Sequence, residues 1–365
     1  MTERDAPTGC LGEPLSDAAI FARRGLTFPS FASSRPAKEL RGSSKHAVRA
    51  LAWNSDGKVL ISSSNDGSAR TWHLERMTDA RMSNELLGHS DVIMAVASNP
   101  THPDLLATGS VDKTVRLWDL RMPQAARVVQ TPGANINLSY HPLGRFIALG
   151  DKNETVSCID ADQGELLYSI KDGSLDRQEI NELAWSPDGQ FLLLPMGNGS
   201  VNFLGVPAQP DECTRTHETA FHPDWKRLAE RFAHPATIFC LQYDPMARYV
   251  GANNSLVATA AADSTIALWN ADEWTSAHVF SEFKHPARTL GFSHDGEWLA
   301  AGGEDTEVHI MSTATGHVAH RLKIAGATNA LAWHPSRLVL AYSGSEAPAA
   351  VAAARVPPIS LYSIP

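Results

Sequence analysis

The chain has few of the residue patterns that mark several large classes of protein. It contains only 4 cysteines in 365 residues, Cys10, Cys158, Cys213 and Cys240. Their spacing includes no Cys-x-x-Cys pair, which argues against a zinc ribbon or a disulfide framework. No stretch approaches the roughly 18 consecutive apolar residues of a membrane span, and the N-terminal region lacks the apolar core of a signal peptide. We therefore expect reduced thiols, no membrane contact and a location inside the cell.

An excess of positive charge is also missing. The chain carries 31 Lys and Arg against 40 Asp and Glu, a formal net charge of -9. Proteins that grip phosphate backbones usually present a concentrated basic face. This balance favours protein partners, and we expect no direct sequence-specific nucleic-acid binding. The length and the 43% hydrophobic content allow either two average domains or one large all-β domain.

What the sequence does contain is an internal repeat of about 43 residues. A strand-like segment of each copy ends at a column that is aromatic in six of the seven copies, with Leu two positions earlier in six. The column reads Trp53, Ala97, Tyr140, Trp185, Tyr243, Phe292 and Trp333. Because the alternation has a period of two, each segment is predicted to be a strand with one buried face. Turns rich in Pro, Asp and Gly follow these strands, as in the SPDGQ that begins at Ser186.

Several short strands in every repeat match the four-stranded blade of a WD40 β-propeller. One blade cannot bury its own faces, whereas seven blades in a ring can. We therefore predict an all-β, seven-bladed WD40 β-propeller over residues 37–365. The stretch Ala37–Gly42 should supply the outer strand of the last blade, whose inner strands start at Thr328 and end in Ile359–Ile364, so that an N-terminal strand closes the ring. Residues 1–36 should form a flexible, mostly disordered arm.

Three copies carry a His, a Ser or Thr, an Asp and a Trp, the residue types whose hydrogen bonds connect strands within WD40 blades. The sets are His46, Ser62, Asp66 and Trp72; His89, Thr108, Asp112 and Trp118; and His234, Thr259, Asp263 and Trp269. A nucleophilic triad uses similar residue types, but a catalytic group is needed once and this set occurs three times at equivalent positions. We interpret the sets as structural tetrads, and we predict no catalytic residue and no cofactor. The other four repeats have lost most of the set, and Asp305, for example, is followed six residues later by Met311.

Partner-binding residues are expected at the start of each inner strand. The residues four positions before the aromatic column are Arg49, Ile93, Ile136, Asn181, Phe239, Arg288 and Asn329. They should lie near one rim of the central channel, where propellers commonly bind peptides or partner subunits. From this column we select Arg49, Asn181, Phe239, Arg288 and Asn329 as a candidate partner-binding rim, although polar rim residues are often only solvated. Loops on a rigid scaffold are a common place for such function.

Two insertions interrupt the period, at about residues 206–231 and 344–358. In the first, Trp225, Leu228 and Phe232 stand at i, i+3 and i+7, which is compatible with a short amphipathic helix that contacts a partner through Trp225. The alternative is a surface loop whose apolar residues fold back onto the blade. Cys213, His217 and His222 lie nearby, but they lack a fourth ligand and standard spacing, so we predict no metal site. The second insertion is rich in Ala and Pro and should be an exposed loop.

The degenerate repeats carry a family resemblance. The segments Asn135–Ala161 and Glu179–Leu204 resemble repeats of the THO complex subunit 3 family, the WD40 subunits of the THO/TREX machinery that couples transcription to mRNA export. Further similar stretches begin at Tyr243, Arg288 and Ala327, and the resemblance covers roughly residues 45–364. Three loops depart from the family: the two insertions and the GANNSLV segment at residue 251.

The resemblance implies a non-enzymatic scaffold subunit in the nucleus that acts in assembly and export of messenger ribonucleoprotein. Its partners would be the large helical scaffold subunits of THO and, indirectly, an RNA helicase and an mRNA export adaptor. An alternative comes from the LWDLR sequence, in which Trp118–Arg121 fits the Trp-Asp-x-Arg pattern that some WD40 substrate receptors use to bind a cullin-type ubiquitin ligase adaptor. A propeller enzyme would need converging acids, histidines or metal ligands at the channel mouth, and the rim column offers none.

Overall fold

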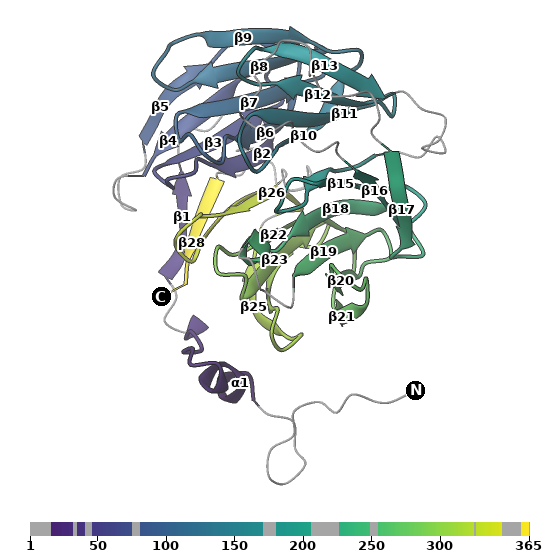
Figure 1. Cartoon of the computed structure of the whole chain (residues 1–365). Helices are drawn as coiled ribbons and strands as arrows, with labels where there is room; N and C mark the ends of the chain where they lie inside the picture. Colours follow the sequence, from purple (N-terminus) through teal and green to yellow (C-terminus); the bar gives the residue numbers. More distant parts are fainter. Residues whose placement is uncertain are drawn as a thin grey trace.

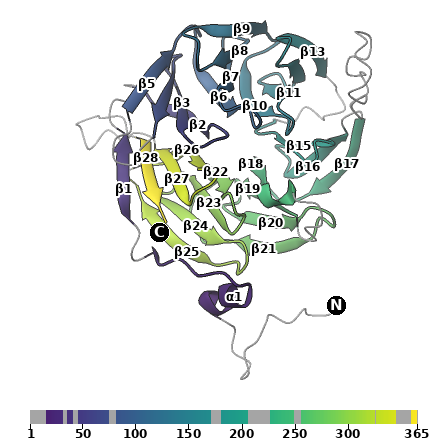
Figure 2. The same cartoon turned by 60° about the vertical axis from the view of Figure 1, so that its left-hand side comes forward.

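The computed structural model describes residues 16–31, 35–40, 46–74, 81–170, 180–205, 226–248, 255–324, 326–344 and 359–364. These residues form seven four-stranded antiparallel sheets, which stand as blades around a central channel (Figures 1 and 2). The predicted seven-bladed propeller is thereby confirmed.

Each blade runs from an innermost strand beside the channel to an outermost strand at the periphery. The innermost strands are β2 (Val48–Trp53), β6 (Ile93–Ser98), β10 (Asn135–Tyr140), β14 (Ala184–Trp185), β18 (Ile238–Tyr243), β22 (Ala287–Phe292) and β26 (Thr328–Trp333). The second strands are β3 (Val59–Ser64), β7 (Leu105–Ser110), β11 (Phe146–Asp151), β15 (Phe191–Pro195), β19 (Leu256–Ala261), β23 (Trp298–Gly303) and β27 (Val339–Gly344). The third strands are β4 (Ala69–His73), β8 (Thr114–Asp119), β12 (Val156–Asp160), β16 (Ser200–Gly205), β20 (Ile266–Asn270), β24 (Glu307–Ser312) and β28 (Ile359–Ser363). The outermost strands are β5 (Arg81–Leu86), β9 (Ala125–Gln130), β13 (Glu165–Ile170), β17 (Lys226–Phe232), β21 (Ser276–Phe280), β25 (Val318–Lys323) and β1 (Arg35–Leu40).

The ring closes as the sequence predicts. Strand β1 pairs antiparallel with β28, and Leu40 lies opposite Ile359. The first and last strands of the chain therefore share blade 7 with β26 and β27. This pairing of an N-terminal strand with a C-terminal strand closes the ring. A closed ring leaves few exposed sheet edges.

The hydrophobic core lies between the blades. The buried apolar side chains separate into seven clusters, and each cluster combines residues of two adjacent blades. The tryptophans of the aromatic column add polar links across these junctions. The indole N–H of Trp53 donates to the Ala332 carbonyl of the preceding blade at 3.1 Å, and Trp333 donates to the Gly291 carbonyl at 2.9 Å. The tryptophans of the column therefore bond their innermost strands to the preceding blade.

The aromatic column needs one correction, in blade 2. Strand pairing places Ser98 opposite Leu106, just as Trp53 lies opposite Leu60 in blade 1. Ser98, and not Ala97, therefore occupies the column. Blade 2 has no aromatic residue there, so spacing alone could not fix the position, and a one-residue error moves every side chain to the other face.

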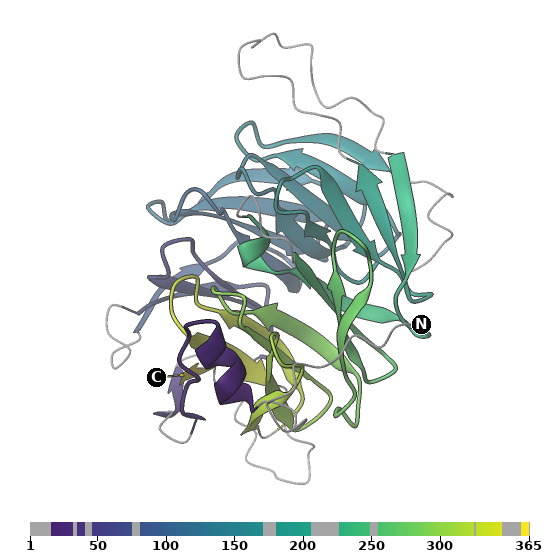
Figure 3. The same ribbon diagram turned by 60° about the horizontal axis from the view of Figure 1, so that its bottom comes forward.

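The N-terminal segment differs from the expected flexible arm over residues 16–31. It contains helix α1 (Asp17–Arg23), which lies beside blade 6 (Figure 3). Phe21 is buried and stacks on Trp298 with ring centroids 5.4 Å apart, and Phe28 and Phe31 contact the same indole edge-on. Three phenylalanines supply enough apolar surface to order a short segment that composition alone marks as disordered.

The first insertion also differs from its prediction. Residues Lys226–Phe232 form strand β17, the outermost strand of blade 4, and Ala229 pairs with Phe203 of β16. Both interpretations of the sequence, the amphipathic helix and the surface loop folded back onto the blade, are therefore wrong over residues 226–232, because pairing with β16 makes this segment a strand and leaves Leu228 58% and Phe232 67% exposed. Trp225, Cys213, His217 and His222 lie outside the described residues, as does most of the second insertion. Within the described parts of the chain, no helix is long and apolar enough to span a membrane.

Candidate interaction surface at the channel mouth

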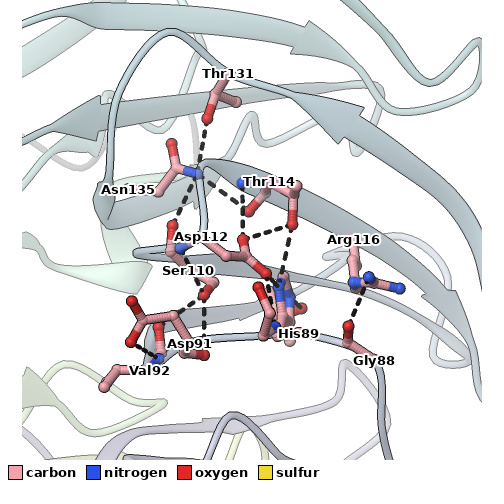
Figure 4. A network of polar contacts seen from close by, with 12 residues as sticks. Gly88, His89, Asp91, Val92, Ser110, Asp112, Thr114, Arg116, Thr131 and Asn135 are labelled. Atoms are coloured by element: carbon pink, nitrogen blue, oxygen red, sulfur yellow. Dashed lines mark hydrogen bonds and ion pairs between the residues drawn. The ribbon is translucent and has the colours of Figure 1, made fainter.

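Two of the three predicted tetrads form complete hydrogen-bond chains. In blade 2, His89 contacts Asp112 through Nδ1 at 2.8 Å (Figure 4), and it contacts Thr108 through Nε2, also at 2.8 Å. The Trp118 indole N–H donates to the same Thr108 hydroxyl at 2.9 Å. The carboxylate can only accept, so the His89 Nδ1 carries the proton and Nε2 accepts from the Thr108 hydroxyl. His234, Asp263, Thr259 and Trp269 repeat the arrangement in blade 5.

The protonation states fit this chain of donors and acceptors. Burial lowers the pKa of His89 below its ordinary value, although Asp112 opposes the shift. Burial alone would raise the pKa of Asp112, but hydrogen bonds from Thr114, His89 and Ser90 outweigh it and hold that pKa low. The pair is therefore a neutral imidazole beside an ionised carboxylate.

The same geometry explains why a tetrad is not a catalytic site. A Ser or Thr nucleophile beside a His and an Asp resembles a triad. However, Thr108 has 0% of its surface exposed and already accepts the indole N–H of Trp118. A substrate has no access to this hydroxyl, and the tetrad serves to fix the strands of its blade.

The predicted set of blade 1 differs from the other two. Trp72 donates to the Ser62 hydroxyl at 3.0 Å, but His46 is exposed, and Asp66 contacts Ser68 and Arg70. The reason is the position of the histidine. His89 and His234 each stand four residues before the first residue of their strands, whereas His46 stands only two before Val48. The number of residues between the histidine and the following strand therefore distinguishes the sets of His89 and His234 from the set of His46.

Blades without the histidine fix the same turn with other groups. In blade 6, Asp305 accepts the backbone N–H groups of Lys284 and His285 at 2.9 and 3.3 Å. In blade 3, Asn135 reaches across to blade 2 and donates to the carbonyls of Ser110 and Thr114 (Figure 4). Hydrogen bonds within blade 6 and between blades 3 and 2 therefore hold these turns where the tetrad histidine is missing.

The rim column coincides with a β-bulge. In blades 2, 3, 5, 6 and 7 the register between the innermost and second strands shifts by one residue at this position. The unpaired residues are Met94, Ile136, Phe239, Arg288 and Asn329, and in blade 1 the shift spans Arg49 and Ala50. Bulges redirect side chains, and all of these residues line the central channel. Met94 replaces the predicted Ile93, which is fully buried between blades 1 and 2.

The charged rim residues are held by neighbours on the turns around the mouth. Arg288 donates to Glu304 at 2.6 Å, and its guanidinium lies over the Phe239 ring, 4.4 Å from the centroid. Arg49 donates to the Asn65 amide oxygen at 2.6 Å. The structure therefore gathers Arg49, Asn181, Phe239, Arg288 and Asn329 at one channel, while their role in binding stays a prediction.

The channel forms a cavity of about 890 Å³. Its wall contains an acid that the rim analysis missed, Glu182, which is only partly exposed. Burial raises the pKa of Glu182 from its ordinary 4.5 to about 7, and a bond from the Leu183 N–H opposes this only weakly. At the far part of the wall lie Asp244 and His294. Among the described residues, no group of three His, Cys, Asp or Glu side chains could hold a metal ion.

The alternative adaptor motif lies away from the channel. Asp119 ends strand β8, and Arg121 follows in the turn to β9 with 71% of its side chain exposed. Arg121 forms two bonds to the Asp119 carboxylate, at 2.8 and 2.6 Å. Arg121 is therefore a solvated residue just past strand β8, and it is bonded to Asp119, the other charged residue of the motif.

Blade geometry, tetrads and ring closure together define the chain as a WD40-repeat β-propeller. The family model described as WD domain, G-beta repeat matches residues 34–73, 81–119 and 225–270, and the model for the WD40 domain of anaphase-promoting complex subunit 4 matches residues 251–336. The crystal structure of the Myceliophteria thermophila Cps50 (Swd1) β-propeller domain superposes with a TM-score of 0.71 at 20% identity, covering 90% of this chain and 99% of that one. That likeness concerns the fold alone.

Sequence similarity places the chain more narrowly. It is 33% identical to THO complex subunit 3 of Arabidopsis thaliana over 303 residues, which cover 83% of this chain and 88% of the relative. The chain belongs to the THO complex subunit 3 family. It is also 25% identical to the WD repeat-containing protein AAC3 of Dictyostelium discoideum, over 84% of this chain but 63% of that protein.

Proposed function

We propose that the chain is the WD40 scaffold subunit of a THO-type complex, acting in the nucleus in transcription-coupled assembly and export of messenger ribonucleoprotein. The observation that carries this proposal is 33% identity to THO complex subunit 3 over 83% of the chain. The family and the fold support protein–protein interaction within a complex. The net charge of -9 supports protein contacts over direct binding to RNA.

The partners we propose are the large helical scaffold subunits of THO, with an RNA helicase and an mRNA export adaptor reached indirectly. The test is affinity purification of the tagged chain from nuclease-treated nuclear extract, followed by mass spectrometry. Near-stoichiometric recovery of the large THO subunits is the expected result. Recovery of a cullin adaptor without THO subunits would reject the proposal and favour the substrate-receptor alternative, in which charge reversal at Asp119 and Arg121 abolishes adaptor binding.

The channel mouth is the part of the ring that we propose for contact with the scaffold subunits. Arg288→Ala removes a guanidinium at the mouth, whereas Arg321→Ala removes one on the outermost strand of the same blade, where it pairs with Glu282. Both are surface pairs, so neither change should alter stability by more than about 0.5 kcal/mol. Loss of THO subunits with Arg288→Ala alone is expected, and equal recovery with both variants would move the interface away from the mouth.

A further inference from the structure

Blade 4 differs from the other six blades where it meets the channel. Its innermost strand β14 has two residues, whereas the other innermost strands have six. An isolated bridge joins Ile180 to Met196, and regular pairing resumes only at Ala184. Residues 181–183 therefore run along the channel without forming a ladder with β15.

The register of this stretch is nevertheless that of the other blades: Ile180 lies opposite Met196 and Ala184 opposite Leu193, which leaves one extra residue on the inner strand, as in blade 2. In blade 3, the amide of Asn137 donates to the Ile180 carbonyl of the next blade at 3.2 Å. In blade 4, Asn181 makes the equivalent bond to the Ile238 carbonyl at 3.0 Å, although it stands one position earlier relative to the aromatic column. Glu182 follows at the position that Asn137 holds in blade 3, and both residues line the channel.

Glu182 is a carboxylate without a cation. Its only hydrogen bond among the described residues comes from the Leu183 N–H, at 3.3 Å. The residues at the same distance from the column in the other blades are uncharged: Ala50, Ala95, Asn137, Cys240, Thr289 and Ala330. Both arginines of the mouth are bonded elsewhere, Arg288 to Glu304 and Arg49 to Asn65. Since Glu182 lines the cavity and is partly exposed, its free surface faces the channel.

We propose that the channel mouth binds one basic side chain of a partner segment, an arginine or a lysine, with the Glu182 carboxylate as its acceptor. A carboxylate that has lost much of its water gains most from a donor that carries positive charge. Glu182 lies one residue deeper than the rim, about 3.3 Å along a strand, so a long side chain is needed to reach it.

The wall of the mouth suits the stem of such a side chain. Met94, Ile136 and Phe239 line the channel at the rim level, and their apolar surfaces can cover the methylene groups of lysine or arginine. A metal ion is a poorer occupant, since hard cations take several oxygen ligands and the described residues offer no group of three ligating side chains. The inference deepens the proposed function by naming the chemistry of the partner, and it is tested without any THO subunit.

The test uses two blocked pentapeptides that differ only in a central arginine or its neutral isostere citrulline, titrated into the purified full chain by calorimetry. The arginine peptide should bind about 10-fold more tightly, the ratio expected for one hydrogen bond to a charged group. Glu182→Gln should reduce that ratio to about one, because glutamine keeps the acceptor for the Leu183 N–H and removes only the charge. Glu273→Gln removes an exposed carboxylate away from the channel and should keep the preference.

Three results would each overturn the proposal: equal binding of the two peptides, a preference that survives Glu182→Gln, or no binding of either peptide at millimolar concentration. A lysine and acetyl-lysine pair of peptides, titrated in the same way, shows which basic group the channel prefers. Recovery of THO subunits from extract does not enter this test, so the inference and the proposed function can fail separately.

Discussion

Replacing Glu182 by Gln should make the protein more stable at neutral and alkaline pH. Burial raises the pKa of Glu182 from 4.5 to about 7 in the folded chain. The folded state therefore holds the proton more tightly than the unfolded state does. The stability that this proton contributes is complete below about pH 4.5, falls as the pH rises, and is gone above about pH 7. Glutamine cannot ionise, so the variant does not lose stability in this window.

The size of the effect follows from the shift. A difference of about 2.5 pKa units at about 1.4 kcal/mol per unit gives at most about 3.5 kcal/mol in favour of the variant, nearly all of it present at pH 8. At about pH 5 the same linkage stabilises the variant over the wild type by only about 1 kcal/mol. All other titrating groups are common to both proteins, so they cancel in the difference.

Urea unfolding of the wild type and of Glu182→Gln from pH 5 to pH 8 measures this difference directly. Glu273→Gln removes a carboxylate that is exposed, and it should stay within about 0.5 kcal/mol of the wild type at every pH. A gap between wild type and Glu182→Gln that does not change with pH would refute the reasoning, because it would mean that the carboxylate is as well solvated in the channel as in the unfolded chain.

Two further predictions concern the fold. His89→Ala should lower the free energy of unfolding by about 2 to 3 kcal/mol, because it leaves a buried hydroxyl and a carboxylate without their partner. His46→Ala should cost less than about 1 kcal/mol, since His46 is exposed, and urea unfolding of the two variants side by side compares them. Phe21→Ala should cost about 3 kcal/mol and speed hydrogen exchange in residues 16–31, because this ring is 2% exposed and stacks on an indole; unchanged exchange there would contradict the docked helix.

Much of the ring was predictable because its signals are local and repeat. The period-two alternation, the turns and the position of Ala37–Gly42 suffice to predict seven blades and their closure. In the tetrads of His89 and His234 the Thr, Asp and Trp stand at fixed offsets, whereas Thr follows His by 19 residues in one and by 25 in the other. The strands, turns and fixed offsets depend on residues close together in sequence. Closure pairs Leu40 with the distant Ile359, and it was predictable because the blades must form a ring.

The errors arise where a distant or one-residue feature decides the outcome. Residues Lys226–Phe232 fit a helical period, but pairing with β16 makes them a strand, and such pairing is invisible in a local pattern. In blade 2 no aromatic residue marks the column, so its position was predicted one residue too early. As a result, Ile93 was predicted at the rim, where the structure has Met94. His46 was assigned by residue type, although it is exposed and stands only two residues before β2, whereas His89 is buried and stands four residues before β6.

The channel acid was missed for a related reason. A β-bulge recurs at the rim of the ring, so the column four residues before the aromatic position reaches the channel in most blades. The next position along the strand also lines the channel in every blade, and in blade 4 it is Glu182, directly after Asn181. Only the first of these two channel-lining columns was considered, and Glu182 stands in the second. The available sequence signal was that Glu182 is an acid in a column, three positions before the aromatic residue, that is otherwise uncharged.

The arrangement of the core explains how blade 4 can depart from the repeat without breaking the ring. Each junction between blades has its own apolar cluster, and the cluster between blades 3 and 4 includes Ile180, Leu183 and Trp185 on either side of the unpaired stretch. These three side chains hold the strand in place where its backbone pairing is missing. Glu182, directly before Leu183, therefore lies in the channel wall at a position that is uncharged in the other six blades. For that reason we expect partner specificity in this propeller to depend on its least regular blade, while the blades with complete tetrads supply a rigid frame.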